Sequence, residues 1–281
     1  MNKYLRLFRF GNGVMGIVGV VVGAFIASGF DIADHWPGIM ISCLIVFIFM
    51  AGGNAINDYI DREIDITAHP ERPVPSGEIS SGTARSLGVL MILSAIMIGI
   101  LALIVSELLG FRFWGPASAV IVVLAAVLMM SYEAFLKQRG LFGNVTIAVL
   151  TGMLFLLGGA VCGDTMAVVP MAFMAMLVNV GREISKDIED EDSDEGRRTL
   201  PMIIGNTKAA AFSATFFLMG VALSIWPLLA GSLNDLYMLV FCADAMFIYA
   251  AIIVFRSAHK AQKAAKVAMA LALAAFVIGV I

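Results

Sequence analysis

Two acidic stretches, residues 54–65 and 182–194, hold the densest clusters of side chains that could do chemistry in this chain. They read NAINDYIDREID and REISKDIEDEDSD, and each follows directly on a long apolar run. Asn57, Asp61 and Asp65 are spaced four residues apart, so they can lie along one face of a helix. Carboxylates stacked this closely repel one another unless a positive charge lies between them. The pattern therefore indicates divalent cations that hold a strongly anionic ligand.

The second stretch repeats the spacing, with Asp190 and Asp194 four residues apart. A diphosphate ester suits such a layout, because Mg²⁺ held by carboxylates, amides and water can bridge its oxygens to the protein. Arginine can contact the remaining oxygens in a bidentate way, and lysine can act as a point charge. The basic residues available near the two stretches are Arg9, Arg72, Lys137, Arg139, Arg182, Lys186 and Arg198.

The composition indicates that membrane-spanning helices position these residues. Of the 281 residues, 60% are hydrophobic and only 14% are charged, and the mean hydropathy is +0.95. Apolar runs of spanning length predict an all-α polytopic bundle of about nine transmembrane helices, with no role in nucleic-acid binding. The predicted helices cover residues 11–30, 38–57, 87–106, 114–132, 141–161, 166–181, 209–230, 236–255 and 262–281.

The placement of Lys and Arg predicts the orientation of the bundle. All but Arg112 of the 18 Lys and Arg residues lie at the N-terminus or in loops that the prediction puts on one side of the membrane, namely 58–86, 133–140, 182–208 and 256–266. The positive-inside rule then puts the N-terminus and both acidic stretches on the cytoplasmic side of a cell membrane. We expect the helices to surround a central apolar cavity, with the two acidic motifs at its cytoplasmic mouth.

A repeated pattern predicts that the chain consists of two related halves. An Arg-x-x-Pro sequence follows each acidic stretch, at residues 72–75 and 198–201. The two stretches follow helices that are four apart in the predicted order, which keeps the same direction through the membrane. We therefore expect a single domain over residues 1–281, with a parallel internal repeat of about 1–132 and 133–256 and a site between the halves.

Each of these signals also has a structural interpretation. Acidic residues at a helix end can be the solvated rim of a bundle, and Arg9 and Arg139 can simply set topology. Tyr132 can be an interfacial anchor, and Asn144 can form interhelical hydrogen bonds. Asp244 falls in the middle of a predicted span, where an ionisable residue is usually functional or paired, and the sequence names no partner for it. Two dense motifs, each followed by Arg-x-x-Pro, favour the functional interpretation.

Loss of diphosphate beside an apolar cavity that can hold a long hydrocarbon tail describes prenyl transfer. At these residues the sequence resembles the UbiA superfamily of intramembrane prenyltransferases. The pattern NDxxDxxxD at residues 57–65, followed by Arg72, looks like the family's first motif. The pattern DxxDxxxD at residues 187–194, followed by Arg198, looks like its second. The family fold, nine helices around a central cavity, agrees with the helices predicted from hydropathy.

By position in the family's motifs, the resemblance implies a role for each residue. The catalytic carboxylates would be Asp61, Asp65, Asp190 and Asp194. The ligands of Mg²⁺ would be drawn from Asn57, Asp58, Asp61, Asp65, Asp187, Asp190 and Asp194. The substrate-binding residues would be Arg9, Asn12, Asn54, Arg72, Tyr132, Lys137, Asn144, Arg182, Lys186 and Arg198.

Within the superfamily, residues 182–190 are most similar to the archaeal branch that makes ether lipids. That similarity implies Mg²⁺-dependent transfer of geranylgeranyl from its diphosphate to the hydroxyl of geranylgeranylglyceryl phosphate. The implied partners are a prenyl diphosphate donor, a lipid glycerophosphate acceptor and membrane lipids. The implied mechanism is loss of diphosphate to give an allylic cation that the acceptor oxygen captures. A carboxylate such as Asp65 would take the proton.

Two other functions stay open at this point. An aromatic acceptor, as in quinone or chlorophyll biosynthesis, would use the same donor and would need no second phosphate site. A divalent-cation or organic-anion transporter would also carry acidic residues. Transporter sites, however, usually lie near the bilayer midplane, whereas both stretches are predicted at one face.

Overall fold

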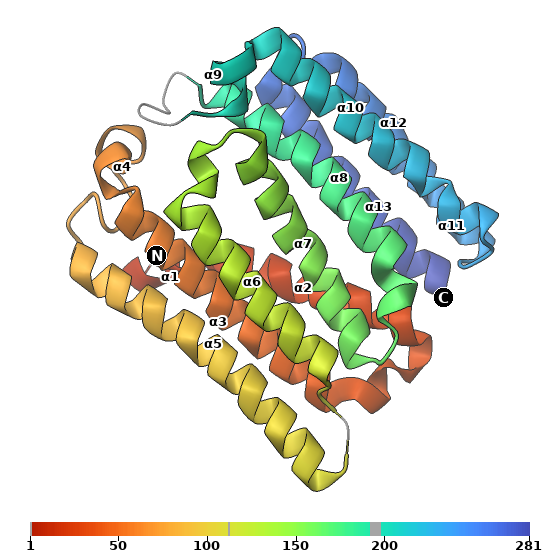
Figure 1. The fold of residues 1–281 in the computed structure, drawn as a ribbon. Coiled ribbons are helices and arrows are strands. Elements are labelled where there is room, and N and C mark those ends of the chain that lie inside the picture. Colours follow the sequence, from red (N-terminus) through yellow and green to blue (C-terminus); the bar gives the residue numbers. More distant parts are fainter. Residues whose placement is uncertain (1, 112, 192–197) are drawn as a thin grey trace.

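The computed structural model describes residues 2–111, 113–191 and 198–281, and these residues form helices joined by turns and loops (Figure 1). Helices suit a bilayer because each segment satisfies its own backbone N–H and C=O groups where no water is available. The elements are α1 (Lys3–Leu7), α2 (Phe10–Ser28), η1 (Gly29–His35), α3 (Trp36–Ile60), α4 (Arg62–Ala68), α5 (Ser81–Leu109), α6 (Pro116–Ala134), η2 (Leu136–Gln138), α7 (Leu141–Val161), α8 (Thr165–Glu189), α9 (Leu200–Ile204), α10 (Asn206–Ser224), α11 (Trp226–Leu229), η3 (Asp235–Leu239), α12 (Val240–Ile253) and α13 (Ala258–Val280).

Eight stretches of the described residues are long and apolar enough to cross a membrane. The first, Phe10–Ile60, has 51 residues and contains both α2 and α3, which are separated by the short 3-10 helix η1. Because α2 and α3 also pack against each other, the chain reverses between them, and each is long enough for a crossing of its own. Each of the nine predicted ranges overlaps one of the long helices, and the chain is a multi-pass membrane protein.

Helix α8 extends further than the sequence predicts. The predicted span ends at residue 181, where charged residues begin, whereas the helix continues to Glu189. Apolar contacts explain the difference, because Ile184 is fully buried and Ile188 packs against the same cluster of side chains. Hydropathy marks the part of a helix that lies in lipid and gives no signal where the helix continues beyond it. The extension carries part of the second acidic stretch on a regular helix.

Helix α2 packs against α7 as well as against α3 (Figure 1). Glycines allow this close approach. A Cβ added to Gly23 would meet the backbone of Phe155, and one added to Gly158 would meet the backbone of Val20. Small residues let membrane helices come into backbone contact, which increases the van der Waals attraction between them.

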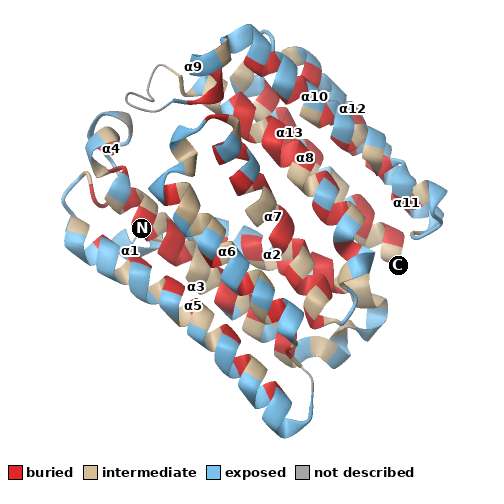
Figure 2. Ribbon diagram, in the orientation of Figure 1, coloured by how far each residue is buried: buried red, intermediate tan, exposed pale blue. Residues whose placement is uncertain are grey.

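Large apolar side chains cover the outside of the bundle. Figure 2 shows exposed positions along the outer side of α5, and Leu90, Leu93 and Leu101 on this helix are all more than half exposed. Apart from Ile92, its buried positions are small residues such as Ala84 and Ala95. Exposed leucine would be unfavourable in water, at about 25 cal/mol for each Å². Lipid tails remove that cost, so the surface agrees with a membrane environment.

Candidate active site at one end of the bundle

The two acidic stretches begin at the C-terminal ends of α3 and α8, which lie at the same end of the bundle as α4 and α9 (Figure 1). Helix α3 ends at Ile60, and the chain resumes as α4 after Asp61. The backbone N–H groups of Asp61 and Asp65 still bond to the carbonyl groups four residues earlier, at 2.9 and 2.8 Å. The helical hydrogen-bond pattern therefore continues across the end of α3. The side chains of Asn57 and Asp61, four residues apart, are in contact, because Asn57 Nδ2 donates to Asp61 Oδ2 at 3.0 Å.

Three side chains from α3, α6 and η2, together with Asp61, form a closed ring of hydrogen bonds. Asn57 Nδ2 donates to Asp61 and also to Glu133 Oε1, the latter at 3.2 Å. Lys137 Nζ donates to Asp61 Oδ1 at 2.7 Å and to Glu133 Oε2 at 2.8 Å. Asp61 and Glu133 are buried, and the Lys137 side chain is only 5% exposed. Buried charges are costly unless they are paired, and this ring pairs them.

The other two buried carboxylates of the first stretch are each paired with an arginine. Arg9 Nη2 donates to Asp58 Oδ1 at 2.7 Å and to Asn57 Oδ1 at 3.1 Å. Arg72 Nη1 donates to Asp65 Oδ2. Arg9 has a φ of 44°, a left-handed conformation that is uncommon for residues other than glycine, and it caps the start of α2. The structure thus brings Arg9, Arg72 and Lys137 to the first stretch, and their predicted roles in substrate binding stay predictions.

The N-terminal segment also holds the loop that follows the first stretch. Asn54 Nδ2 donates to the Phe8 carbonyl at 3.0 Å. Lys3 Nζ donates to the Glu78 carbonyl at 3.1 Å, and Arg6 forms an ion pair with the Glu78 carboxylate. The hydrogen bond from Arg6 lowers the pKa of Glu78, an exposed group outside the spans. Asn54 therefore supports the segment that carries Arg9.

The described contacts of the second acidic stretch reach α7, α10 and α13. Asn144 Nδ2 donates to Asp187 Oδ2 at 2.9 Å. Arg182, the first residue of the stretch, donates from Nε to Asn179 Oδ1 at 2.9 Å, and its guanidinium also pairs with the adjacent Glu183. Asp190 caps α8, and its N–H donates to a carbonyl in the last turn. Asp194 lies outside the described residues, so its predicted role stays a prediction.

The segment 133–144 touches both acidic stretches. Lys137 bonds to Asp61 of the first, and Asn144 bonds to Asp187 of the second. The N–H of Gly140, which has a φ of 54°, donates to the Arg198 carbonyl at 3.0 Å. The segment that includes the short connection between α6 and α7 therefore links the two acidic stretches.

Several other predicted site residues lie in the same region, and the structure shows how exposed each of them is. Asn12 is exposed in the first turn of α2, where its N–H donates to the Arg9 carbonyl at 2.7 Å. Tyr132 is half-buried near the end of α6. The Lys186 and Arg198 side chains are exposed. Their predicted roles in substrate binding stay predictions.

The donor set at this end of the bundle fits a hard divalent cation. Asn57, Asp58, Asp61 and Asp65 present amide and carboxylate oxygens, the ligands that Mg²⁺ prefers. With Glu133, the cluster has four buried carboxylates, and among the described residues Arg9, Arg72 and Lys137 form ion pairs with them. Within the described residues, no three His, Cys, Asp or Glu side chains already converge as a metal site. The residues suit Mg²⁺ chemically, because their oxygens are hard ligands.

Sequence reasoning did not identify Glu133 as part of this cluster. The available signal was an acidic residue near the end of a predicted span, followed by Lys137 four residues later. An acid and a lysine at this spacing are common on helix surfaces, where the ion pair adds only modestly to helix stability. The contact with Asn57 on α3 depends on how α3 and α6 come together, which hydropathy does not reveal.

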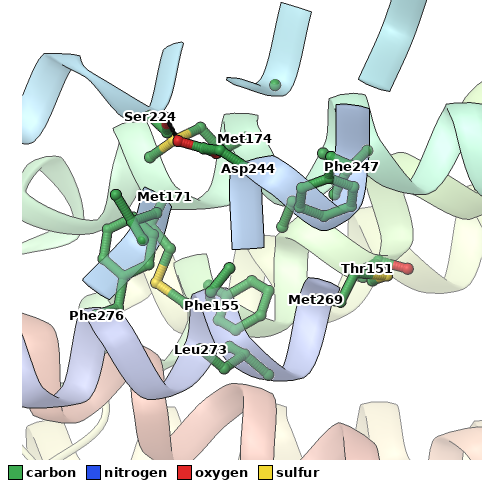
Figure 3. Close-up of a pocket in the computed structure, with 15 residues that line it drawn as sticks. Thr151, Phe155, Met171, Met174, Ser224, Asp244, Phe247, Met269, Leu273 and Phe276 are labelled. Atoms are coloured by element: carbon green, nitrogen blue, oxygen red, sulfur yellow. Dashed lines mark hydrogen bonds between the residues drawn. The ribbon is translucent and has the colours of Figure 1, made fainter. Parts of the chain in front are cut away.

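A separate apolar cavity of about 70 Å³ lies among α7, α8, α10, α12 and α13 (Figure 3). Phe155, Met171 and Phe276 line it, and none of the predicted site residues within the described part of the chain does so. Asp244 also lines it, and its Oδ2 accepts a hydrogen bond from Ser224 Oγ at 2.8 Å. The mid-span carboxyl therefore has a partner. The central cavity expected beneath the acidic motifs stays a prediction.

Known proteins resemble this chain over its full length. A relative, the digeranylgeranylglyceryl phosphate synthase of Methanothermobacter thermautotrophicus, is 37% identical over 287 residues, which cover 99% of this chain and 96% of the relative. A solved structure of a digeranylgeranylglyceryl phosphate synthase in membranes is similar at 29% identity and a TM-score of 0.80, and covers 99% of this chain and 97% of that one.

More distant relatives share the fold. The structure of a UbiA homolog from Archaeoglobus fulgidus, bound to GPP and Mg²⁺, has a TM-score of 0.72 at 16% identity and covers 99% of each chain. At that identity the likeness shows the fold alone. Residues 16–276 of this chain also match the UbiA prenyltransferase family as a whole. Because this match spans most of the sequence and full-length relatives reach 37% identity, the chain belongs to the UbiA prenyltransferase family.

Proposed function

We propose that the protein transfers a geranylgeranyl group from geranylgeranyl diphosphate to the hydroxyl of geranylgeranylglyceryl phosphate and releases diphosphate. The observation that carries the proposal is the full-length similarity to a digeranylgeranylglyceryl phosphate synthase, at 37% identity over 99% of the chain. The cluster of buried carboxylates and cations at one end of the bundle supports it, because a diphosphate requires such charges. The apolar surface of the helices supports a hydrocarbon substrate.

The cations of the cluster are the groups that would bind the diphosphate. Arg9, Lys137 and Arg72 are each held beside a buried carboxylate, so their charges already lie at the end of the bundle where the donor would bind. Mg²⁺, which a UbiA homolog from Archaeoglobus fulgidus binds together with GPP, would neutralise charge on the leaving diphosphate. Asn57, Asp61, Asp190 and Asp194 would hold it.

The reaction breaks the bond between C1 of the donor and its bridging oxygen, and the electron pair leaves with diphosphate. The acceptor hydroxyl oxygen forms the new bond to C1, and its proton passes to a carboxylate. Asp65 is our candidate base, because it is buried in the cluster and Arg72 orients it. The apolar helices would keep water away from the allylic cation.

The test uses purified protein in lipid or detergent with labelled geranylgeranyl diphosphate, in Mg²⁺ or in EDTA. Geranylgeranylglyceryl phosphate and 4-hydroxybenzoate are offered as competing acceptors. We expect a Mg²⁺-dependent, doubly prenylated glycerophosphate. Product on the aromatic ring alone would contradict the lipid acceptor and favour quinone-type chemistry. If neither acceptor is prenylated, the proposed transfer is wrong, and metal uptake in vesicles without a prenyl donor would favour the transporter.

A further inference from the structure

Glu133 is a buried charge within the site region to which the proposed function gives no role. It lies in the last turn of α6 and is only 4% exposed. A buried carboxylate without partners is strongly unfavourable, and both oxygens of Glu133 are bonded, one to Asn57 and the other to Lys137. These two partners are also the partners of Asp61. Glu133 and Asp61 are therefore two acids that share the same two donors.

The sharing has a consequence for charge. One ammonium group, on Lys137, lies between two carboxylates at nearly equal distances of 2.7 and 2.8 Å. In the described contacts, these two acids therefore share one ammonium group. The sharing also leaves Lys137 with a second partner if Asp61 becomes engaged elsewhere.

The backbone fixes where the lysine side chain begins. Lys137 lies in η2, just beyond the end of α6. A Cβ added to Gly143 would come within 3.0 Å of the Leu136 carbonyl oxygen and 3.2 Å of the Lys137 Cα, so η2 lies directly against the first turn of α7. Packing therefore holds the base of the side chain, and Glu133 holds the ammonium at its tip.

We propose that Glu133 is a positioning residue that keeps the Lys137 ammonium in place when Asp61 binds a divalent cation. Without Glu133, Lys137 and Asp61 would form a neutral pair, and Asp61 would have to release its lysine partner completely to bind the metal. With Glu133, the lysine stays in the cluster, charged and ready to contact a diphosphate oxygen. This inference rests on the proposed function and adds a residue to it.

The binding test uses the purified full-length protein and Mg²⁺ with inorganic pyrophosphate, followed by titration calorimetry. Glu133→Gln keeps the shape of the side chain and removes its charge, and we expect affinity for magnesium pyrophosphate to fall by about ten- to hundredfold. Glu133→Asp keeps the charge on a shorter side chain and should lose less. Glu71→Gln is the matched control, because the Glu71 side chain is 71% exposed, and it should bind like the parent.

A second readout needs neither metal nor substrate. In EDTA, Lys137→Met leaves Asp61 and Glu133 as two buried carboxylates without their shared ammonium, so the Tm should fall by several degrees. Adding Glu133→Gln removes one of these charges and should raise the Tm again. The Glu133→Gln binding measurement stands even where Lys137→Met does not fold.

Unchanged affinity of Glu133→Gln for magnesium pyrophosphate would overturn the proposal, because a purely structural role would alter Tm alone. A double variant no more stable than Lys137→Met would overturn it too. Failure of the parent protein itself to bind magnesium pyrophosphate would contradict the proposed function, and this role would fall with it. Normal prenyl transfer by the parent, with unaltered binding in Glu133→Gln, would contradict the role of Glu133 alone.

Discussion

At the scale of single residues, the buried carboxylates of the first acidic stretch are paired with cations from distant parts of the chain. Asp58 pairs with Arg9 before α2, Asp61 with Lys137 in η2, and Asp65 with Arg72 after α4. A basic residue that would bind diphosphate therefore also has a role in the protein without substrate. There it stabilises a carboxylate that would otherwise be buried without a counter-charge. The pairs explain how so many acids can lie close together before any metal binds.

Asp61 provides the sharpest test at this scale. Asp61→Asn keeps the size of the side chain and removes the charge that a divalent cation would need. Transfer of the prenyl group at saturating Mg²⁺ should fall by at least about a hundredfold, since even outer-shell partners of a metal are worth about ten- to hundredfold. Turnover per protein molecule in detergent is the measurement.

Asp34→Asn is the matched control for this change, because Asp34 is exposed in η1, which joins α2 to α3 away from the acidic stretches. Its turnover should stay close to that of the parent. Near-normal turnover in Asp61→Asn would contradict the metal-binding role of the first stretch.

Some of the site could be predicted from residue spacing, and some could not. The four-residue spacing of Asn57 and Asp61 predicts a local contact, and the structure has one. The pairing of Asn144 with Asp187 joins two helices, so no spacing within the chain predicts it. Asn144 is predicted as a site residue only because the sequence resembles a family at this position. A family pattern reflects tertiary contacts, which the residue spacing in a single chain does not show.

At the scale of helices, hydropathy predicts where spans lie, and it fails where a helix leaves the lipid. The range 141–161 coincides with α7, because both of its ends are marked by glycine or polar residues. Helix α8 exceeds its predicted range because its last turns are charged, although Ile184 is buried against neighbouring side chains. Packing therefore decides the length of this helix.

The close contact between α2 and α7 requires glycine at position 158, and this requirement can be tested. Gly158→Ala would place a Cβ against the backbone of Val20, which has no flexible side chain to move aside. Overpacking of this kind costs about 1–3 kcal/mol, so the Tm in detergent should fall. Scanning fluorimetry of the purified protein measures it.

Gly82→Ala serves as the control, since Gly82 lies in the first turn of α5 with only the Ser80 hydroxyl within 4.0 Å of an added Cβ. Alanine is the better helix former, by about 1 kcal/mol, so the Tm should hold or rise slightly. Equal Tm values for the two variants would contradict the prediction, because they would mean that α2 and α7 can move apart without loss of stability.

The order in which helices pack also favours the internal repeat, which we propose as a duplication. In the first half, α2 packs on α3, α3 on α5, and α5 on α6. In the second half, α7 packs on α8, α8 on α10, and α10 on α12. Each acidic stretch begins near the C-terminal end of the second helix of its series.

At the scale of the whole molecule, we propose that the N-terminus and the acidic stretches face the cytoplasm. The proposal predicts opposite labelling of two loops in a variant whose cysteines, Cys43, Cys162 and Cys242, are replaced by alanine. A membrane-impermeant maleimide should label Ser232→Cys in intact cells and should label Ser76→Cys only after lysis. Both positions are exposed, and they lie in loops at opposite ends of the bundle.

The reverse labelling pattern would contradict the proposed orientation and leave the site chemistry unchanged. Labelling of both loops in intact cells would mean that the bundle inserts in two directions. Lys and Arg are concentrated so strongly in one set of loops that a single orientation is expected.

The packing of α2 on α7 also matters during synthesis. A ribosome makes α2 first, and the helix that covers its glycine-rich face appears only after α3, α5 and α6 have been made. Until then, the face that includes Gly23 has only lipid or transient partners. A quality-control protease that recognises small-residue faces in the bilayer would thus detect unfinished chains, and insertion of α7 would end that period of vulnerability.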